Sequence, residues 1–170
     1  MKRFLLVAFL FVAALRAQEA HPQFGYSPTV PFDADGKCIA AAWQNADQLG
    51  RFNIPAQSTV ATYNTTVQML YDDNCLYITF RGRFEPQFAV KQAQKNQLWH
   101  DDNYEILINP DPATLSYSQI AVSWSGDVFF AQNGGTSGDT QGITTHTYAS
   151  GANTSITNVT IPLAKIGLDA

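Results

Sequence analysis

Basic residues are scarce in this 170-residue chain, and their scarcity excludes a class of partner. Lysine and arginine together number 10, against 14 aspartates and glutamates. The first 17 residues hold three of the basic residues and none of the acidic ones, so residues 18–170 carry 7 basic and 14 acidic residues, a net charge of −7. Such a surface repels phosphate backbones. We therefore expect no nucleic-acid partner.

Cysteine and histidine are also scarce, and their arrangement does not suit a zinc site. The only cysteines are Cys38 and Cys75, and the three histidines stand singly along the chain. No CxxC pair or paired histidines accompany them, which zinc sites typically need. In an exported protein an even pair of cysteines favours a disulfide, with two buried free thiols as the alternative. A Cys38–Cys75 bridge would close a loop of 36 intervening residues and stabilise the fold by about 3 to 4 kcal/mol.

Long apolar runs are absent except at the N-terminus. Residues 4–15, "FLLVAFLFVAAL", follow two basic residues. This run is shorter than the roughly 20 residues that span a bilayer and is typical of a secretory signal. We predict cleavage after Ala17, with a retained N-terminal anchor as the alternative. The chain would then comprise a signal peptide (1–17), an N-terminal lead (18–29) and one domain (30–170). We expect it to be extracellular or periplasmic, without a membrane association after cleavage.

Helix-forming patterns are few, and short alternating strands dominate. Strand patterns occupy residues 65–84, 103–112, 117–132 and 155–168, with turn residues such as Asp72–Asn74 between them. One or two helical turns are predicted within 39–52, another within 88–99 and a short one after Pro162. The glycine-rich loop 133–142 lacks the lysine and the following helix of a phosphate-binding loop. The pattern predicts an all-β antiparallel sandwich, of the jelly-roll or immunoglobulin-like kind.

The alternation of side chains along strands separates a polar face from the core. In 103–109 the apolar set is Tyr104, Ile106 and Ile108, so Glu105 points to the other face. Gln119 likewise points away from the apolar residues of its strand, and Arg81 points away from those of its own. A polar face that carries Glu105, Gln119 and Arg81, with Trp99 at its rim, is therefore predicted.

Five segments in order resemble carbohydrate-binding module family 9. They are "VPFDADGKCIAAAWQNA", "MLYDDNCLYITF", "LWHDDNYEILINPD", "YSQIAVSWSGDVF" and "VTIPLAKIGL". Together they run from about Val30 to Leu168. The resemblance implies a β-sandwich related to DOMON-like domains. It also implies binding of a polysaccharide or oligosaccharide, commonly as a non-catalytic accessory to a secreted glycoside hydrolase.

The same resemblance implies roles for particular residues. A tryptophan stacks on the pyranose ring and a glutamate six residues later binds the hydroxyls; Trp99 and Glu105 stand at that spacing. Gln119 sits where a polar strand residue would reach the same sugar, and the strand parity described above adds Arg81 to the sugar-binding set. No cofactor is required, but relatives hold calcium, and the resemblance makes Asp72, Asp73 and Asp102 its candidate ligands.

The chain departs from the family at its C-terminal end. Sandwich-type sugar binding in the family uses a second tryptophan after the "IPL" strand, whereas this sequence stops at Ala170. We therefore expect a module that lacks its last strands and binds sugar weakly. Unpaired groups along a sheet edge invite association, so we also expect marginal stability or dimerisation.

Two other functions remain as alternatives. In a glycosidase, Asp101, Asp102 and Glu105 would act as the paired carboxylates, although the two aspartates are adjacent and share one loop. In a haem-binding DOMON-like domain, Met69 would be the iron ligand, although it shares the apolar parity of its strand. A non-catalytic binding domain is therefore the preferred interpretation.

Overall fold

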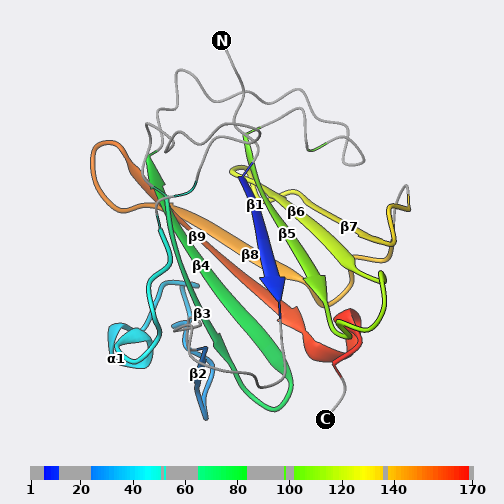
Figure 1. Ribbon diagram of the computed structural model, residues 1–170. Helices are drawn as coiled ribbons and strands as arrows, with labels where there is room; N and C mark the ends of the chain where they lie inside the picture. Colours follow the sequence, from blue (N-terminus) through cyan, green and yellow to red (C-terminus); the bar gives the residue numbers. More distant parts are fainter. Residues whose placement is uncertain are drawn as a thin grey trace.

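The computed structural model describes residues 6–11, 24–50, 52, 65–83, 98, 102–135 and 138–168. They form two β-sheets packed face to face (Figure 1). Sheet A has the order β1 (Leu6–Phe11), β5 (Asn103–Asn109), β6 (Ser118–Ser123) and β7 (Val128–Gln132). Sheet B has the order β2 (Gly25–Tyr26), β3 (Thr66–Tyr71), β4 (Cys75–Arg83), β9 (Thr154–Pro162) and β8 (Thr144–Ala149).

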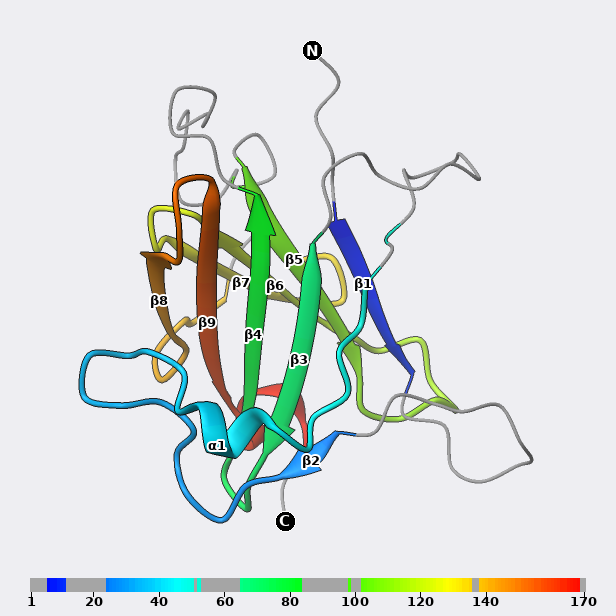
Figure 2. The same ribbon diagram turned by 90° about the vertical axis from the view of Figure 1, so that its left-hand side faces the viewer.

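The helical elements within the described ranges are short. Helix α1 (Ala40–Trp43) lies in front of sheet B in Figure 2, and a 3-10 helix follows β9 at Leu163–Ile166. Both fall where helical turns were predicted, whereas the predicted turn in 88–99 lies almost wholly outside the described residues. None of the helices described is long and apolar enough to cross a membrane. The predicted all-β sandwich is confirmed.

Strand pairing is antiparallel except at one edge of each sheet. β1 pairs with β5 in parallel and β2 pairs with β3 in parallel. The hairpins β3–β4 and β6–β7 form where the alternating patterns predicted them. β8 was not predicted, because its sequence "TTHTYA" is an edge strand with half-exposed polar residues on both faces. It pairs with β9 over its whole length.

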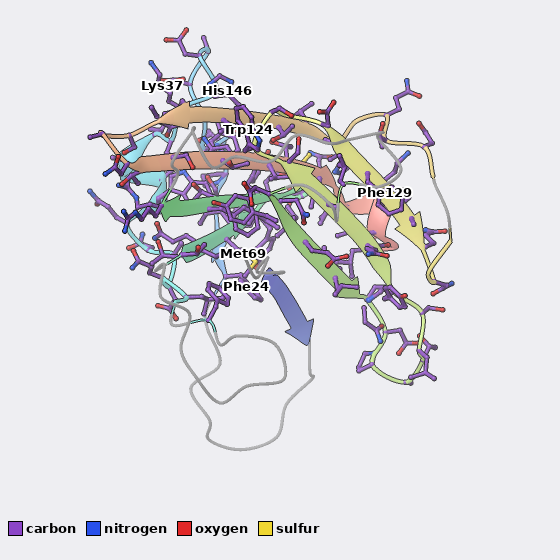
Figure 3. The ribbon with its side chains drawn as sticks, turned by 90° about the horizontal axis from the view of Figure 1, so that it is seen from above. Phe24, Lys37, Met69, Trp124, Phe129 and His146 are labelled. Carbon is purple, nitrogen blue, oxygen red and sulfur yellow. The ribbon has the colours of Figure 1, made fainter. Side chains whose placement is uncertain are left out.

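The main core lies between the two sheets. Alternate residues of β4 and β5 face each other there, among them Ile78, Phe80 and Ile106, each only 1% exposed. The rings of Phe80 and Tyr104 stack with their centroids 4.3 Å apart. Met69, the haem-ligand candidate, is 2% exposed and packs inside this cluster (Figure 3). Its thioether therefore contributes to the core, and the described residues give the haem alternative no support.

Burial of Tyr104 makes the stability of the fold sensitive to alkaline pH. Burial raises the pKa of the Tyr104 phenol to about 12, against the opposing effect of its hydrogen bond with Ser155. The folded state thus holds this proton more tightly than the unfolded state. The resulting stability is fully present below pH ~10 and is lost as pH rises towards 12.

We expect Tyr104→Phe to flatten this alkaline decline. The unfolding free energy of the natural chain should fall by about 2 kcal/mol more than that of the variant between pH 9 and 12, because a pKa shift of about two units has this order of effect. Urea unfolding at several pH values measures the difference. Parallel pH profiles for the two proteins would contradict it.

In the β3–β4 turn, the carboxylates of two predicted metal ligands, Asp72 and Asp73, accept hydrogen bonds from the protein itself. Asp72 Oδ1 accepts the amide hydrogens of Asn74 and Cys75, both at 2.7 Å, and its Oδ2 accepts the Tyr77 hydroxyl at 2.6 Å. Partial burial acts to raise the pKa of Asp72, but these hydrogen bonds outweigh it and lower the pKa. Asp73 Oδ1 accepts the Tyr26 hydroxyl at 3.3 Å. Asp72 therefore shapes the turn.

The two cysteines are free thiols, so the predicted Cys38–Cys75 disulfide is not present in the structure. The Cys38 sulfur lies 3.5 Å from Thr79 Oγ1 and 3.3 Å from Asn158 Oδ1. Thr79 follows Cys75 by four residues in β4, which is about 13 Å along a strand. A disulfide needs Cα atoms within about 7 Å. The even number of cysteines in an exported chain suggested the pair, but Cys38 lies beside Thr79, further along β4 than Cys75.

β1 falls inside the segment that the sequence marks as a secretory signal. Its six residues pair in register with β5, from Leu6 opposite Tyr104 to Phe11 opposite Asn109. Cleavage after Ala17 would remove β1 and leave the backbone groups on this side of β5 without that partner. Residues 6–11 of the apolar run therefore form an edge strand of sheet A.

Candidate functional site

The outer face of sheet A carries two of the residues that the sequence singled out, Glu105 and Gln119. In β5 the side chains of Ile106 and Ile108 enter the core, so Glu105 projects from the opposite face. The strand register places Glu105 beside Ala121 in β6, and Ala121 beside Phe129 in β7. The predicted separation of Glu105 from the core residues of its strand is confirmed.

Glu105 and Gln119 form a polar pair on this face. Gln119 Nε2 donates a hydrogen bond to Glu105 Oε1. Glu105 is 6% exposed, and Gln119 is half-buried. Gln119 pairs with Leu107, so the two polar side chains meet diagonally across neighbouring strands. A buried carboxylate requires hydrogen-bond donors, and Gln119 supplies one.

Leu98, the residue before Trp99 in the sequence, packs on the same face. It is fully buried and packs with Ala121, Phe129 and Ala131, which form a small apolar cluster separate from the main core. The amide of Asn103 donates a hydrogen bond of 2.6 Å to the carbonyl oxygen of Leu98. Leu98 therefore lies on the sheet face that carries Glu105. Trp99 itself lies outside the described residues.

Sequence reasoning missed Leu98 and Asn103 as part of this arrangement. In the sequence Leu98 is an ordinary apolar residue before a loop. The residues that it packs against lie far along the chain, in β6 and β7. The available signal was Asn103, because an asparagine that follows a loop often bonds to nearby backbone. This bond spans five residues and closes the loop between Leu98 and β5.

The pair can recognise hydroxyl groups. A carboxylate accepts up to about four hydrogen bonds, and an amide both donates and accepts. Because Gln119 donates to one carboxylate oxygen, the other oxygen of Glu105 and the carbonyl oxygen of Gln119 are the natural acceptors for ligand hydroxyls. Adjacent apolar side chains would pack on the non-polar faces of the same ligand.

Arg81 does not join this site. It lies in β4 between Thr66 and Ile156 of the neighbouring strands, and Arg81 Nη1 donates to Ser150 Oγ at 3.4 Å. It shares its face with Tyr77 and Thr79, on the outer side of sheet B. The two outer faces are separated by the main core, so the single polar face predicted for Arg81, Glu105 and Gln119 is wrong. The alternation of side chains shows which residues of a strand face away from the core, but it does not show to which sheet the strand belongs.

The three predicted calcium ligands do not meet either. Asp72 and Asp73 precede β4, whereas Asp102 precedes β5 near the far end of β4, where Gly82 approaches Tyr104. The nine residues of β4 span about 26 Å. In the described part of the chain, no group of three or more histidines, cysteines and acidic residues could hold a metal ion.

Among the described residues, the carboxylates that a glycosidase would use do not form a pair. Asp101 lies outside the described residues, and Asp102 is exposed while Glu105 is buried. The backbone carbonyl of Asp102 accepts the amide hydrogen of Trp124 at 3.3 Å. Nothing in this part of the chain favours a catalytic pair over a binding role.

Comparison with known proteins identifies the family. No curated protein matches the chain. The solved structures that match it include two of a family 9 carbohydrate-binding module from Caldicellulosiruptor kristjanssonii, one in complex with glucose and one in complex with cellotriose. The first has 19% identity, a TM-score of 0.59 and coverage of 84% of this chain and 69% of its own. The second has 17% identity, a TM-score of 0.57 and coverage of 85% and 69%. Residues 34–170 match the family model described as "Carbohydrate family 9 binding domain-like", so the chain belongs to that family.

Proposed function

We propose that this chain is a secreted, non-catalytic domain that binds a glucose-containing oligosaccharide, in the service of a polysaccharide-degrading enzyme. The observation that carries the proposal is the buried Glu105–Gln119 pair on the outer face of sheet A, beside Leu98. Membership of the carbohydrate family 9 binding domain-like family supports the ligand class. The matched structures in complex with glucose and cellotriose support the choice of sugar.

In this proposal the sugar makes two kinds of contact, apolar stacking and hydrogen bonding. The Trp99 ring would pack on the CH face of one pyranose ring, and the Glu105–Gln119 pair would bind its hydroxyls. Burial strengthens hydrogen bonds to the carboxylate, because the surroundings have a low dielectric constant. The existing bond from Gln119 holds the carboxylate in position before the ligand arrives, which lowers the entropic cost of binding.

Glu105→Gln tests the proposal with little change of shape. We expect the dissociation constant for cellotriose to rise about 10- to 100-fold, because a hydrogen bond to a charged group contributes about 1.5 to 3 kcal/mol. The melting temperature should change little, since glutamine can still accept the Gln119 hydrogen bond. Isothermal titration calorimetry and thermal unfolding provide the two readouts.

Asp73→Asn is the matched control for Glu105→Gln. It also replaces a carboxylate by an amide, but on an exposed turn before β4. Its cellotriose affinity should equal that of the natural chain. If Glu105→Gln binds cellotriose as tightly as Asp73→Asn, the site does not lie at Glu105.

A further inference from the structure

The outer face of sheet B contains a groove that the proposed site does not use. Its volume is about 760 Å³. One wall is the loop from Val30 to Lys37, and the other consists of residues in β8 and β9. Figure 3 shows Lys37 and His146 close together at this end of the molecule. Ligand sites typically have volumes of about 300 to 1,000 Å³, so the groove is large enough for a small molecule.

The loop that forms the first wall is fixed by its own hydrogen bonds. Asp33 Oδ1 accepts the amide hydrogens of Asp35 at 2.9 Å and Lys37 at 2.8 Å. The backbone amide of Gly36 donates to the Asp33 carbonyl at 2.9 Å. Gly36 has a φ of +72°, in the left-handed region that glycine tolerates best, and a Cβ there would come within 2.8 Å of the His146 ring.

A buried asparagine joins this loop to the sheet. Asn158 in β9 is 2% exposed, and its Nδ2 donates to the Gly36 carbonyl oxygen at 2.7 Å. Its Oδ1 accepts the Cys38 thiol at 3.3 Å. Both ends of the amide are thus used to hold the loop against the strands. The groove is preformed, and a ligand would not have to order it.

The strand register directs a second set of side chains into the groove. Val159 is fully buried in the main core and pairs with Thr145, so the residues on either side face outward. Thr144 pairs with Thr160, and His146 pairs with Asn158. The hydroxyls of Thr144 and Thr160 and the imidazole of His146 therefore line the side of the groove formed by β8 and β9.

The chemistry of the groove suits a neutral ligand with many hydroxyl groups. The wall formed by the loop 30–37 supplies the Asp33 and Asp35 carboxylates and the Lys37 ammonium. Lys37 Nζ lies 3.8 Å from Asp35 Oδ2. Donors and acceptors are mixed, and the local charge is small, so no ion of either sign is favoured. Val30 is 55% exposed at the rim and offers an apolar surface. The described residues hold no group able to bind a metal ion.

The geometry points to a second carbohydrate-binding site, in the groove between the loop 30–37 and strands β8 and β9. It takes its ligand class from the proposed function, but it uses none of the same residues. The two sites lie on the outer faces of opposite sheets. One domain could therefore hold two oligosaccharide segments, and such a link raises the apparent affinity for a polymer without any new contact.

Nuclear magnetic resonance of the full chain, titrated with cellotriose, tests this inference. Saturable shifts are expected at the amides of Gly36, Lys37 and residues 144–146, in the natural chain and in Glu105→Gln alike. His146→Ala should raise the dissociation constant reported by Gly36 and Lys37 at least tenfold and leave that reported by β5 unchanged. Thr144→Arg, which fills the groove from an exposed position, should have the same effect. Lys165→Ala, an alanine exchange at a residue outside the groove, should change neither.

The outcomes separate the groove from the proposed function. Shifts confined to β5 and β6 would overturn the groove and leave the Glu105 site standing. Shifts at the groove without any at β5 would support the groove and overturn the Glu105 site. The absence of shifts at both places would overturn both. Shifts at the groove that persist unchanged in His146→Ala and Thr144→Arg would also overturn the groove.

Discussion

Replacement of Trp99 by alanine should abolish measurable cellotriose binding and leave the fold intact. The ring would contribute the apolar surface that packs on the sugar. Burial of an aromatic side chain is worth about 1.5 to 3 kcal/mol, or about 10- to 100-fold in affinity. Calorimetry with cellotriose and thermal unfolding of the same variant measure the two effects together.

Trp43→Ala is the matched control, because it removes the same side chain from the core. Trp43 is 6% exposed, packs with Phe32 at 5.6 Å between ring centroids, and donates from Nε1 to the Pro31 carbonyl at 3.1 Å. Its removal should cost about 3 to 5 kcal/mol of stability. If Trp99→Ala instead destabilises the domain as much as Trp43→Ala, Trp99 is a packing residue and the stacking role is wrong.

Removal of residues 1–17 should make the protein associate. This change deletes β1 and exposes the edge of β5 from Tyr104 to Asn109. An open edge strand pairs readily with another chain. Light scattering coupled to size-exclusion chromatography should give a monomer for the full chain and a dimer or larger species for residues 18–170.

A charged residue on the exposed edge should reverse this association. Leu107→Lys places a lysine on β5, where it opposes pairing with a second copy. In the truncated chain this variant should return to a monomer. A monomeric truncated chain with an unfolding free energy above roughly 5 kcal/mol, the lower end for ordinary domains, would show that the fold does not depend on a partner for β5.

The sandwich could be predicted because its determinants are local. The alternation in β3, β4, β5 and β6 follows from burial on one side, and the Asp72 turn from side-chain hydrogen bonds to the next residues. The same alternation correctly placed Glu105 and Gln119 away from the core. Their contact then follows from the antiparallel register of β5 and β6.

The errors arise where the outcome depends on contacts distant in sequence. Alternation could not reveal that Arg81 and Glu105 belong to different sheets. The presence of two cysteines did not show whether Cys38 and Cys75 lie close together, and Cys38 instead lies against Thr79 and Asn158. The groove in sheet B required knowledge that residues 30–37 fold over strands more than 100 positions later, which Asn158 secures through Gly36.

The central claim is that cellotriose stacks on Trp99 beside the Glu105–Gln119 pair. Intermolecular nuclear Overhauser effects between cellotriose and the assigned indole protons of Trp99 test it most directly. We predict contacts from the CH protons of one sugar ring to Trp99, together with a shift of the Gln119 side-chain amide. Saturable cellotriose binding without any contact to Trp99 and without a Gln119 shift would contradict the claim.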